Sequence, residues 1–366
     1  MSEKAILVGV KIAGIKDGEF NYSFEELAAL AKSAGAIVCD AITQSRTSPD
    51  VSTYIGKGKV DELKQLVKQT HAELVIFDND LTGSQVRNIE KAIEVRVIDR
   101  TELILDIFAQ RAHTSEAKLQ VELAQLNYLF PRLIGLGVLM SRLGGGIGTR
   151  GPGETELEYD RRRIKRRISH LNKDIQKVAK VRKEQRKARQ NFPVAALVGY
   201  TNAGKSTLLK TLTKTDVTVE DRLFTTLDTK ISKFTLNKHQ ALLLIDTVGF
   251  IQNLPHHLVS SFRATLEEVQ EADILLHIVD VSSPYLELQM ASVQTVLKQL
   301  DVLSTPVVTV FNKIDKFDDA NHISKWLNKT PYSVALCALS GENIDQLVQT
   351  LLRMRIEKNV GNRSPQ

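Results

Sequence analysis

One short segment restricts the fold of this chain more than any other part of the sequence. The apolar run Ala195–Val198 leads directly into a glycine-rich loop, and a helical pattern begins at Thr207. The loop consists of Gly199, Tyr200, Thr201, Asn202, Ala203, Gly204, Lys205 and Ser206. Glycines at this spacing let backbone N–H groups surround phosphate oxygens, and the helix N-terminus favours negative charge. The segment predicts an α/β domain that binds phosphates, with Lys205 reaching the outer phosphates and the Ser206 hydroxyl binding Mg²⁺.

A second apolar run, Leu242–Ile245, ends in residues that can complete a metal and phosphate site. These residues are Asp246, Thr247, Val248 and Gly249. An aspartate at the end of a buried strand can hold Mg²⁺ through a water molecule, and the backbone N–H of Gly249 can contact a γ-phosphate. The D-x-x-G pattern is weak by itself. Its position after a phosphate loop indicates a nucleoside triphosphate site.

A third strand-like run, Pro306–Phe311, is followed by residues that predict which base is bound. These residues are Asn312, Lys313, Ile314 and Asp315. The Asp315 carboxylate has two acceptor oxygens that match the N1–H and 2-amino donors of guanine. Adenine would leave a buried Asp315 unpaired, and such mismatches discriminate strongly. We expect Asn312 and Lys313 to brace the base and the phosphate loop; an exposed Asn-Asp turn is the alternative.

Residues 193–354 resemble the guanine-nucleotide-binding (G) domain of translation-factor-related GTPases. The resemblance implies a first switch, in which Thr226 is a second protein ligand of Mg²⁺. This switch consists of Phe224, Thr225, Thr226, Leu227 and Asp228. The resemblance also implies that the backbone of a later segment touches guanine O6. That segment consists of Cys337, Ala338 and Leu339. The family usually has a serine in place of Cys337, and we expect little effect on base choice because the contact is made by backbone.

Two positions bear on the rate of GTP hydrolysis. Many GTPases place a glutamine after the D-x-x-G glycine to orient the attacking water, but this chain has Phe250. We expect slow hydrolysis alone and faster hydrolysis when a partner orders the switches; hydrolysis that is always slow is the alternative. Asn202 lies where potassium-activated relatives have an asparagine, so it would either help to place K⁺ beside the phosphates or only brace the loop. The candidate catalytic residues are Lys205, Thr226, Gly249 and Asn202.

Positive charge is concentrated in one segment of the chain. Residues 161–190 contain fourteen Lys and Arg against two acids, whereas the whole chain has a net charge of only +6. Apolar residues repeat at heptad-like spacing from Leu119 to Leu133 and again from Ile164 to Val178, which predicts an antiparallel helical hairpin with its basic residues facing outward. This pattern favours a polyanionic partner. A solvated helix with no partner is the alternative.

The remaining sequence sets the domain boundaries. Residues 1–112 alternate strand-like and helical patterns, which predicts an N-terminal α/β domain. We expect the hairpin over 113–192, the G domain over 193–355 and a polar tail over 356–366. Two cysteines exclude a disulfide framework, and neither a secretory signal nor an apolar run long enough to cross a membrane is visible.

The glycine-rich stretch 144–158, GGGIGTRGPGETELE, resembles the signature of HflX-type ribosome-associated GTPases. So does the combination of an N-terminal α/β domain, a basic hairpin and a G domain over about residues 1–355, without the extended C-terminal domain of some relatives. The resemblance implies a cytoplasmic, monomeric GTPase that binds the large ribosomal subunit and its rRNA and splits stalled or idle ribosomes under stress; attachment at the membrane surface is left open. Its candidate RNA-binding residues are Arg150, Arg161, Arg162, Arg163, Lys165, Arg166 and Arg167. The alternatives are a nucleotide-regulated RNA-binding protein that splits nothing, and a signalling GTPase without RNA.

Overall fold

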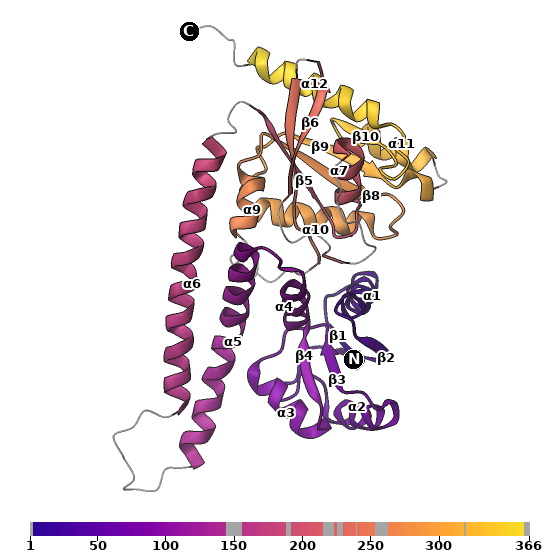
Figure 1. The fold of residues 1–366 in the computed structure, drawn as a ribbon. Helices are drawn as coiled ribbons and strands as arrows, with labels where there is room; N and C mark the ends of the chain where they lie inside the picture. Colours follow the sequence, from indigo (N-terminus) through magenta and orange to yellow (C-terminus); the bar gives the residue numbers. More distant parts are fainter. Residues whose placement is uncertain are drawn as a thin grey trace. The chain divides into compact units, whose positions relative to one another are not determined.

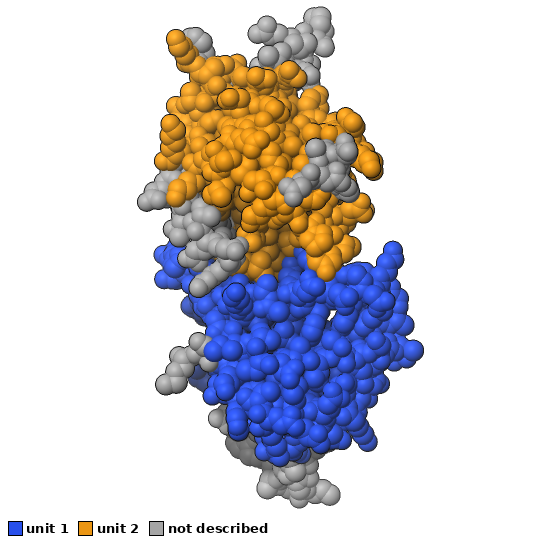
Figure 2. All heavy atoms as spheres, turned by 90° about the vertical axis from the view of Figure 1, so that its right-hand side faces the viewer, with its two compact units in different colours: residues 1–178, 255–262 blue, residues 179–254, 263–366 orange. Residues whose placement is uncertain are grey.

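The chain folds into two compact units, which are coloured separately along the chain in Figure 1 and as solid bodies in Figure 2. The computed structural model describes residues 3–143, 156–187, 192–214, 223–224, 230–238, 240–252, 263–317 and 320–361. The main division between the units falls between Val178 and Ala179, inside a long helix. Each unit is built around its own sheet.

Unit 1 contains a four-stranded parallel sheet in the order β2-β1-β3-β4. Its strands are β1 (Lys4–Ile12), β2 (Ile37–Arg46), β3 (Leu74–Phe77) and β4 (Arg96–Asp99). Its first four helices are α1 (Asp17–Ser33), α2 (Lys57–Thr70), α3 (Gly83–Ile93) and α4 (Arg100–Arg111). Leu63 of α2 and Ile89 of α3 pack against Val8 and Phe77 on one face of the sheet. Alternation of strand and helix produces the parallel sheet because each crossover helix covers a face.

Two long helices complete the hairpin predicted from the heptad-like spacing, α5 (Ser115–Leu143) and α6 (Glu156–Lys187). Leu171 in the apolar stripe of α6 is fully buried. The first part of α5 packs on α3 and α4. It is held there by Asp99, which accepts a hydrogen bond from the Tyr128 hydroxyl at 2.8 Å and pairs with Arg132 at 2.5 Å. The hairpin is therefore anchored to the sheet of unit 1 by a buried carboxylate.

Unit 2 contains a six-stranded sheet in the order β10-β9-β8-β5-β7-β6. The strands are β5 (Val194–Gly199), β6 (Lys230–Asn237), β7 (Gln240–Asp246), β8 (Ile274–Asp280), β9 (Val307–Asn312) and β10 (Ser333–Ala335). All neighbouring strands pair in parallel except β6, which runs antiparallel to β7. The parallel arrangement brings the carboxyl ends of β5, β7 and β9 to one edge, where the three sequence motifs begin.

The helices of unit 2 cover both faces of its sheet. They are α7 (Lys205–Thr213), α9 (Arg263–Gln270), α10 (Leu286–Gln299), the 3₁₀ helix η1 (Ile314–Lys316), α11 (Ala320–Lys329) and α12 (Ile344–Gly361). Leu208 of α7 and Leu347 of α12 share one apolar core with the strands. Met290 of α10 and Trp326 of α11 pack into a smaller cluster. Helix α12 continues to Gly361, past the boundary at 355 expected from the sequence.

The expected fold class is confirmed: a G domain of α/β type, a second α/β domain and a basic antiparallel hairpin. Within the described part of the chain, none of the helices combines the length and the hydropathy that a membrane crossing requires.

Candidate nucleotide-binding site

The phosphate loop connects β5 to α7, and two of its glycines are required by space. A Cβ atom on Gly199 would lie 2.3 Å from the backbone oxygen of Ile278. A Cβ atom on Gly204, whose φ is +96°, would lie 2.2 Å from the side-chain nitrogen of Asn312. Because both contacts are shorter than van der Waals separation, only glycine lets the loop lie this close to β8 and to the end of β9.

Lys205 is the first residue of α7, and its side chain is buried inside the loop. Its ammonium donates hydrogen bonds to the backbone oxygens of Gly199 at 3.1 Å and Tyr200 at 2.8 Å. Burial lowers the pKa of Lys205 to about 8, and the nearby Asp246 carboxylate opposes this shift. The loop therefore holds a desolvated cation within hydrogen-bonding distance of its own backbone, where its charge is weakly screened.

Ser206 and Asp246 form an oxygen-rich pair at the edge of the sheet. The Ser206 hydroxyl donates to a carboxylate oxygen of Asp246 at 2.6 Å, and Asp246 is fully buried at the end of β7. Hard divalent cations prefer hydroxyl, carboxylate and water oxygens, so the donor set fits Mg²⁺. No group of three His, Cys, Asp or Glu side chains suited to a metal occurs elsewhere in the described ranges.

Gly249 brings the D-x-x-G segment against the phosphate loop. A Cβ atom there would lie 2.7 Å from Thr201 Cα and 3.0 Å from the Lys205 ammonium. The next residue, Phe250, is buried, donates its N–H to Gly199 O at 3.1 Å and accepts from Thr201 N at 2.7 Å. Phe250 therefore packs beneath the loop, and its backbone joins the two motifs.

The two residues between Asp246 and Gly249 are buried as well. The Thr247 hydroxyl donates to the backbone oxygen of Leu197 at 2.6 Å, which ties the end of β7 to β5, and Val248 is buried beside it. Their side chains fix the segment, so that the backbone of Gly249 remains the part that faces the loop.

Asn312 links the phosphate loop to the segment that the resemblance assigned to the base. Its side-chain amide donates to Ala203 O at 2.8 Å, and its side-chain oxygen accepts from Ala338 N at 2.9 Å. Asn312 is buried, so both bonds are made away from solvent. The bracing expected from the sequence is present as two hydrogen bonds from one side chain.

Lys313 and Asp315 lie beyond the end of β9. Lys313 has a positive φ of 66°, and its ammonium contacts Asp280 at 2.7 Å. Ile314 begins η1, and Asp315 on the same 3₁₀ helix is exposed, although the base argument treated this carboxylate as buried. The Asp315 carboxylate is therefore accessible to a ligand.

The segment Cys337–Leu339 follows β10. Cys337 and Ala338 are buried, and Ala338 O accepts a hydrogen bond from the Thr211 hydroxyl of α7 at 2.6 Å. Leu339 has 80% of its surface exposed. The backbone of this segment is thus fixed from two sides, by Asn312 and by Thr211.

The structure places other predicted residues around the loop. Thr201 accepts from the N–H of Phe224 at 3.1 Å, and the Tyr200 hydroxyl accepts from the N–H of Gln252 at 2.6 Å. Asn202 is exposed at the tip of the loop with φ +61°, and Thr207 is half-buried on α7. The remaining predicted switch residues and one predicted RNA-binding residue lie outside the described residues. They are Thr225, Thr226, Leu227, Asp228 and Arg150.

The other candidate RNA-binding residues lie in the first turns of α6. Arg161 is half-buried, and the remaining five are exposed. These are Arg162, Arg163, Lys165, Arg166 and Arg167. Only Arg167 has a printed partner among these five: its guanidinium makes two hydrogen bonds of 2.6 Å to the Glu122 carboxylate of α5. The arginine side chains therefore differ in how much of their hydrogen-bonding capacity is already used.

Comparisons with known proteins decide the family. Three family models match in succession, described as GTP-binding GTPase N-terminal over 21–109, GTP-binding GTPase Middle Region over 111–189 and 50S ribosome-binding GTPase over 194–313. The GTPase HflX of Caldanaerobacter subterraneus is 51% identical over 315 residues, covering 86% of this chain and 73% of that protein. The chain belongs to the HflX family of GTPases.

Further relatives agree with this HflX assignment. The GTPase HflX of Escherichia coli K12 is 44% identical over 352 residues, which cover 95% of this chain and 82% of that protein. Among solved structures, the GDP complex of SsGBP has a TM-score of 0.53 at 26% identity and covers 97% of this chain and 99% of that one. The protein is a GTPase that binds guanine nucleotides, and the expected family is confirmed.

Two residues of this HflX-family G domain were missed by the motifs. Asp280 pairs with Lys313, and its position at the end of β8 was the available signal. His277 lies in the middle of β8, is buried, and has its pKa lowered to about 4, first by burial and then by the Lys205 charge. A histidine inside an apolar strand run was visible in the sequence, but its proximity to the lysine depends on the pairing of β5 and β8.

Proposed function

We propose that this HflX-family GTPase is a nucleotide-dependent switch that binds the large ribosomal subunit and its RNA in the GTP state, and separates stalled or idle ribosomes under stress. Asn312 carries the nucleotide part of this proposal, because it joins the phosphate loop to the segment Cys337–Leu339. Support for the ribosome comes from the exposed arginines of α6 and from the match of residues 194–313 to a family model described as a 50S ribosome-binding GTPase.

In this proposal each motif has one task at the phosphates. Ser206, Thr226 and, through water, Asp246 are the residues that would hold Mg²⁺, which neutralises charge on the β- and γ-phosphates when bound. The Lys205 ammonium reaches the same two phosphates. The Gly249 N–H donates to the γ-phosphate, so that this segment and Thr226 report whether the γ-phosphate is present.

Guanine is selected by Asp315, whose exposed carboxylate accepts from the N1–H and the 2-amino group. The backbone at Ala338 lies beside the guanine O6 and is held in place by Asn312. A direct test is competition: GTP and GDP displace a fluorescent guanine nucleotide, whereas ATP in large excess does not. Equal competition by ATP would remove the basis for a guanine-specific switch.

Hydrolysis in this proposal depends on the ribosome. Phe250 is buried beneath the loop, where its ring packs and offers no hydrogen bond to water. Slow turnover alone and faster turnover on large subunits are therefore expected, since other GTPases gain up to about 10⁵-fold from a partner. Turnover that large subunits leave unchanged would contradict this dependence. Asn202 is proposed to place K⁺ beside the phosphates, and equal rates in K⁺ and Na⁺ would exclude that role.

The binding surface for rRNA is proposed to be the basic hairpin. It consists of Arg150, Arg161, Arg162, Arg163, Lys165, Arg166 and Arg167. We propose a cytoplasmic monomer in which the domains 1–112, 113–192 and 193–355 act together.

The central experiment is co-sedimentation of the full chain with 70S ribosomes. In a non-hydrolysable GTP analogue we expect the protein on the large subunit and the particles separated, and in GDP we expect neither. Binding without separation in either nucleotide would favour an RNA-binding protein that splits nothing. Binding to neither subunit at low salt would remove the ribosome from the proposal, while leaving the nucleotide site to be judged by competition.

A further inference from the structure

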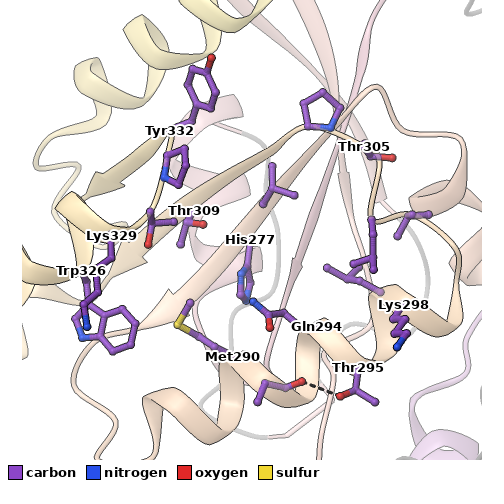
Figure 3. A pocket seen from close by; sticks show the side chains of 18 of the residues that line it. His277, Met290, Gln294, Thr295, Lys298, Thr305, Thr309, Trp326, Lys329 and Tyr332 are labelled. Carbon is purple, nitrogen blue, oxygen red and sulfur yellow. Dashed lines mark hydrogen bonds between the residues drawn. The ribbon is translucent and has the colours of Figure 1, made fainter.

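A second cavity lies in unit 2, on the face of the sheet that α10 and α11 cover (Figure 3). Its volume is about 980 Å³. Strands β8 and β9 form its floor through His277 and Thr309, and Met290 and Trp326 line it from the two helices. None of the residues that line it belongs to the three nucleotide motifs. The cavity is therefore a separate candidate site of the G domain.

The walls of this cavity are apolar and its charged groups have one sign. Lys298 of α10 and Lys329 of α11 line it, and no Asp or Glu is among its described lining residues. The Lys329 ammonium lies 5.6 Å from the centre of the Trp326 ring. Leu303 and Tyr332, which also line the cavity, are 62% and 44% exposed, unusually high values for large apolar side chains. A ligand that is apolar over most of its surface and negative at one end complements this lining.

His277 adds a neutral polar group to the floor. Figure 3 shows its ring directed from β8 toward the α10 side chains of Met290 and Gln294. Burial and the Lys205 charge lower the pKa of His277 to about 4, so the imidazole is uncharged near neutral pH. A neutral imidazole has one N–H donor and one nitrogen acceptor, which can orient a ligand without adding a charge.

We propose that the cavity binds a small amphipathic anion, with an aromatic or acyl body against Trp326 and Met290 and its anionic group beside Lys298 and Lys329. Small-molecule sites have volumes of about 300–1,000 Å³, mostly apolar walls and a few converging polar groups, and the cavity has all three properties. A neutral ligand would leave both lysines uncompensated. A cationic ligand would be repelled by them.

The chain contains its own reporter for this site. Trp326 is its single tryptophan and lines the cavity, so fluorescence excited in that ring reports on the site directly. The probe is 8-anilino-1-naphthalenesulfonate, an aromatic anion, added to the full-length protein with GDP present at saturation. We expect saturable binding of one probe per chain, with energy transfer from Trp326. The uncharged parent compound, N-phenyl-1-naphthylamine, is expected to bind at least about tenfold more weakly.

Two variants of α10 separate the cavity from non-specific binding. Ala291 lines the cavity and is exposed, so Ala291→Phe fills it without disturbing the core, and binding should fall at least about tenfold. Gln299, on the same helix, is exposed and does not line the cavity, so Gln299→Phe should leave binding within about twofold. Equal effects of the two variants, or probe displacement by GDP, would overturn the proposal.

The charge of the cavity is tested separately. The double variant Lys298→Gln/Lys329→Gln should weaken the sulfonate about tenfold and change binding of the uncharged parent less than about twofold. An equal loss for both probes would show that the lysines do not recognise the anion and would overturn the assigned ligand class. Binding that appears only after ribosomal subunits are added would overturn the small-molecule site in favour of a macromolecular partner.

Discussion

Two regions of this protein present cations in opposite ways. In the phosphate loop a single buried lysine, Lys205, is hydrogen-bonded to backbone oxygens and enclosed by glycine contacts. Along the start of α6, Arg162, Arg163 and Arg166 are exposed on the outside of a helix whose apolar stripe faces inward. The loop depends on the position of one charge, and the helix depends on the number of its charges.

The difference teaches where selectivity arises. A desolvated cation costs free energy in the fold, as the lowered pKa of Lys205 indicates, but its field is weakly screened and acts over a defined geometry. Exposed arginines cost little and are screened by salt, so they favour any polyanion of suitable shape. The loop can therefore discriminate between ligands, while α6 supplies affinity that falls with ionic strength.

The largest effect is expected from Lys205→Ala. Removing the ammonium deletes charge-assisted hydrogen bonds to two phosphates, each worth about 1.5–3 kcal/mol, so GTP affinity should fall by about 100-fold or more. Isothermal calorimetry with GDP and a GTP analogue measures the loss. Lys210→Ala is the matched control, because Lys210 is an exposed lysine of the same helix and should leave affinity unchanged. Equal binding by Lys205→Ala and the native protein would break the comparison.

The buried region should also be the more sensitive to acid. His277 takes up a proton near pH 6.5 in the unfolded chain and near pH 4 in the fold, so between these values only the unfolded state binds the proton. The free energy of unfolding should therefore fall as the pH drops from 6.5 to 4, by about 3 kcal/mol from this group. Urea unfolding across this range measures the slope, and His277→Gln should flatten it. An unchanged slope in the variant would contradict the assignment.

Asn312→Ala tests whether the loop and the base segment act as one site. It would leave Ala203 O and Ala338 N buried without their partner, a loss of about 1–3 kcal/mol for each group, so GTP affinity should fall about 10- to 100-fold. Asn312→Asp is the matched variant: it keeps an acceptor for Ala338 N and loses only the donor to Ala203 O. A smaller loss for Asp than for Ala would sharpen the picture of two separate bonds.

The nucleotide site could be predicted from the sequence because its motifs are local. The strand, loop and helix around Gly199–Ser206 form a continuous segment, and the other two motifs follow buried strands whose parallel pairing brings their ends together. Residue types at fixed spacing therefore determine most of the contacts around Lys205 and Asn312. The heptad-like spacing likewise predicted α5 and α6.

Other features could not be predicted because they depend on contacts between distant parts of the chain. Asp99 holds α5 through Tyr128 and Arg132, about thirty residues later, and no motif marks any of the three. The proximity of His277 to Lys205 follows from the order of strands in the sheet. The second cavity requires the packing of α10 beside α11. Periodicity identifies the elements in each case, but it does not say which side chains meet.

Within the basic helix, Arg166 and Arg167 should differ although they are adjacent. Arg167 makes two hydrogen bonds to Glu122, whereas Arg166 is exposed and has no printed partner. Arg162→Gln/Arg166→Gln should weaken ribosome binding about tenfold and reduce its salt slope by about 1 for each charge removed, in any nucleotide state. Sedimentation over a KCl series measures both. Arg167→Gln should cost less than half of either effect, and a larger cost would show that the ion pair opens on RNA.

The smallest effect is expected from Cys337→Ser. Cys337 is buried, and its sulfur accepts from the N–H of Ser340 at 3.5 Å, a bond that a serine hydroxyl can also accept. Ala338 remains fixed by Asn312 and Thr211, so the backbone that faces the base does not move. The ratio of GTP to ATP affinity should therefore change less than about twofold, as measured by competition. A large change would mean that the side chain at 337 itself reads the base, and that selectivity in this site does not rest on backbone geometry alone.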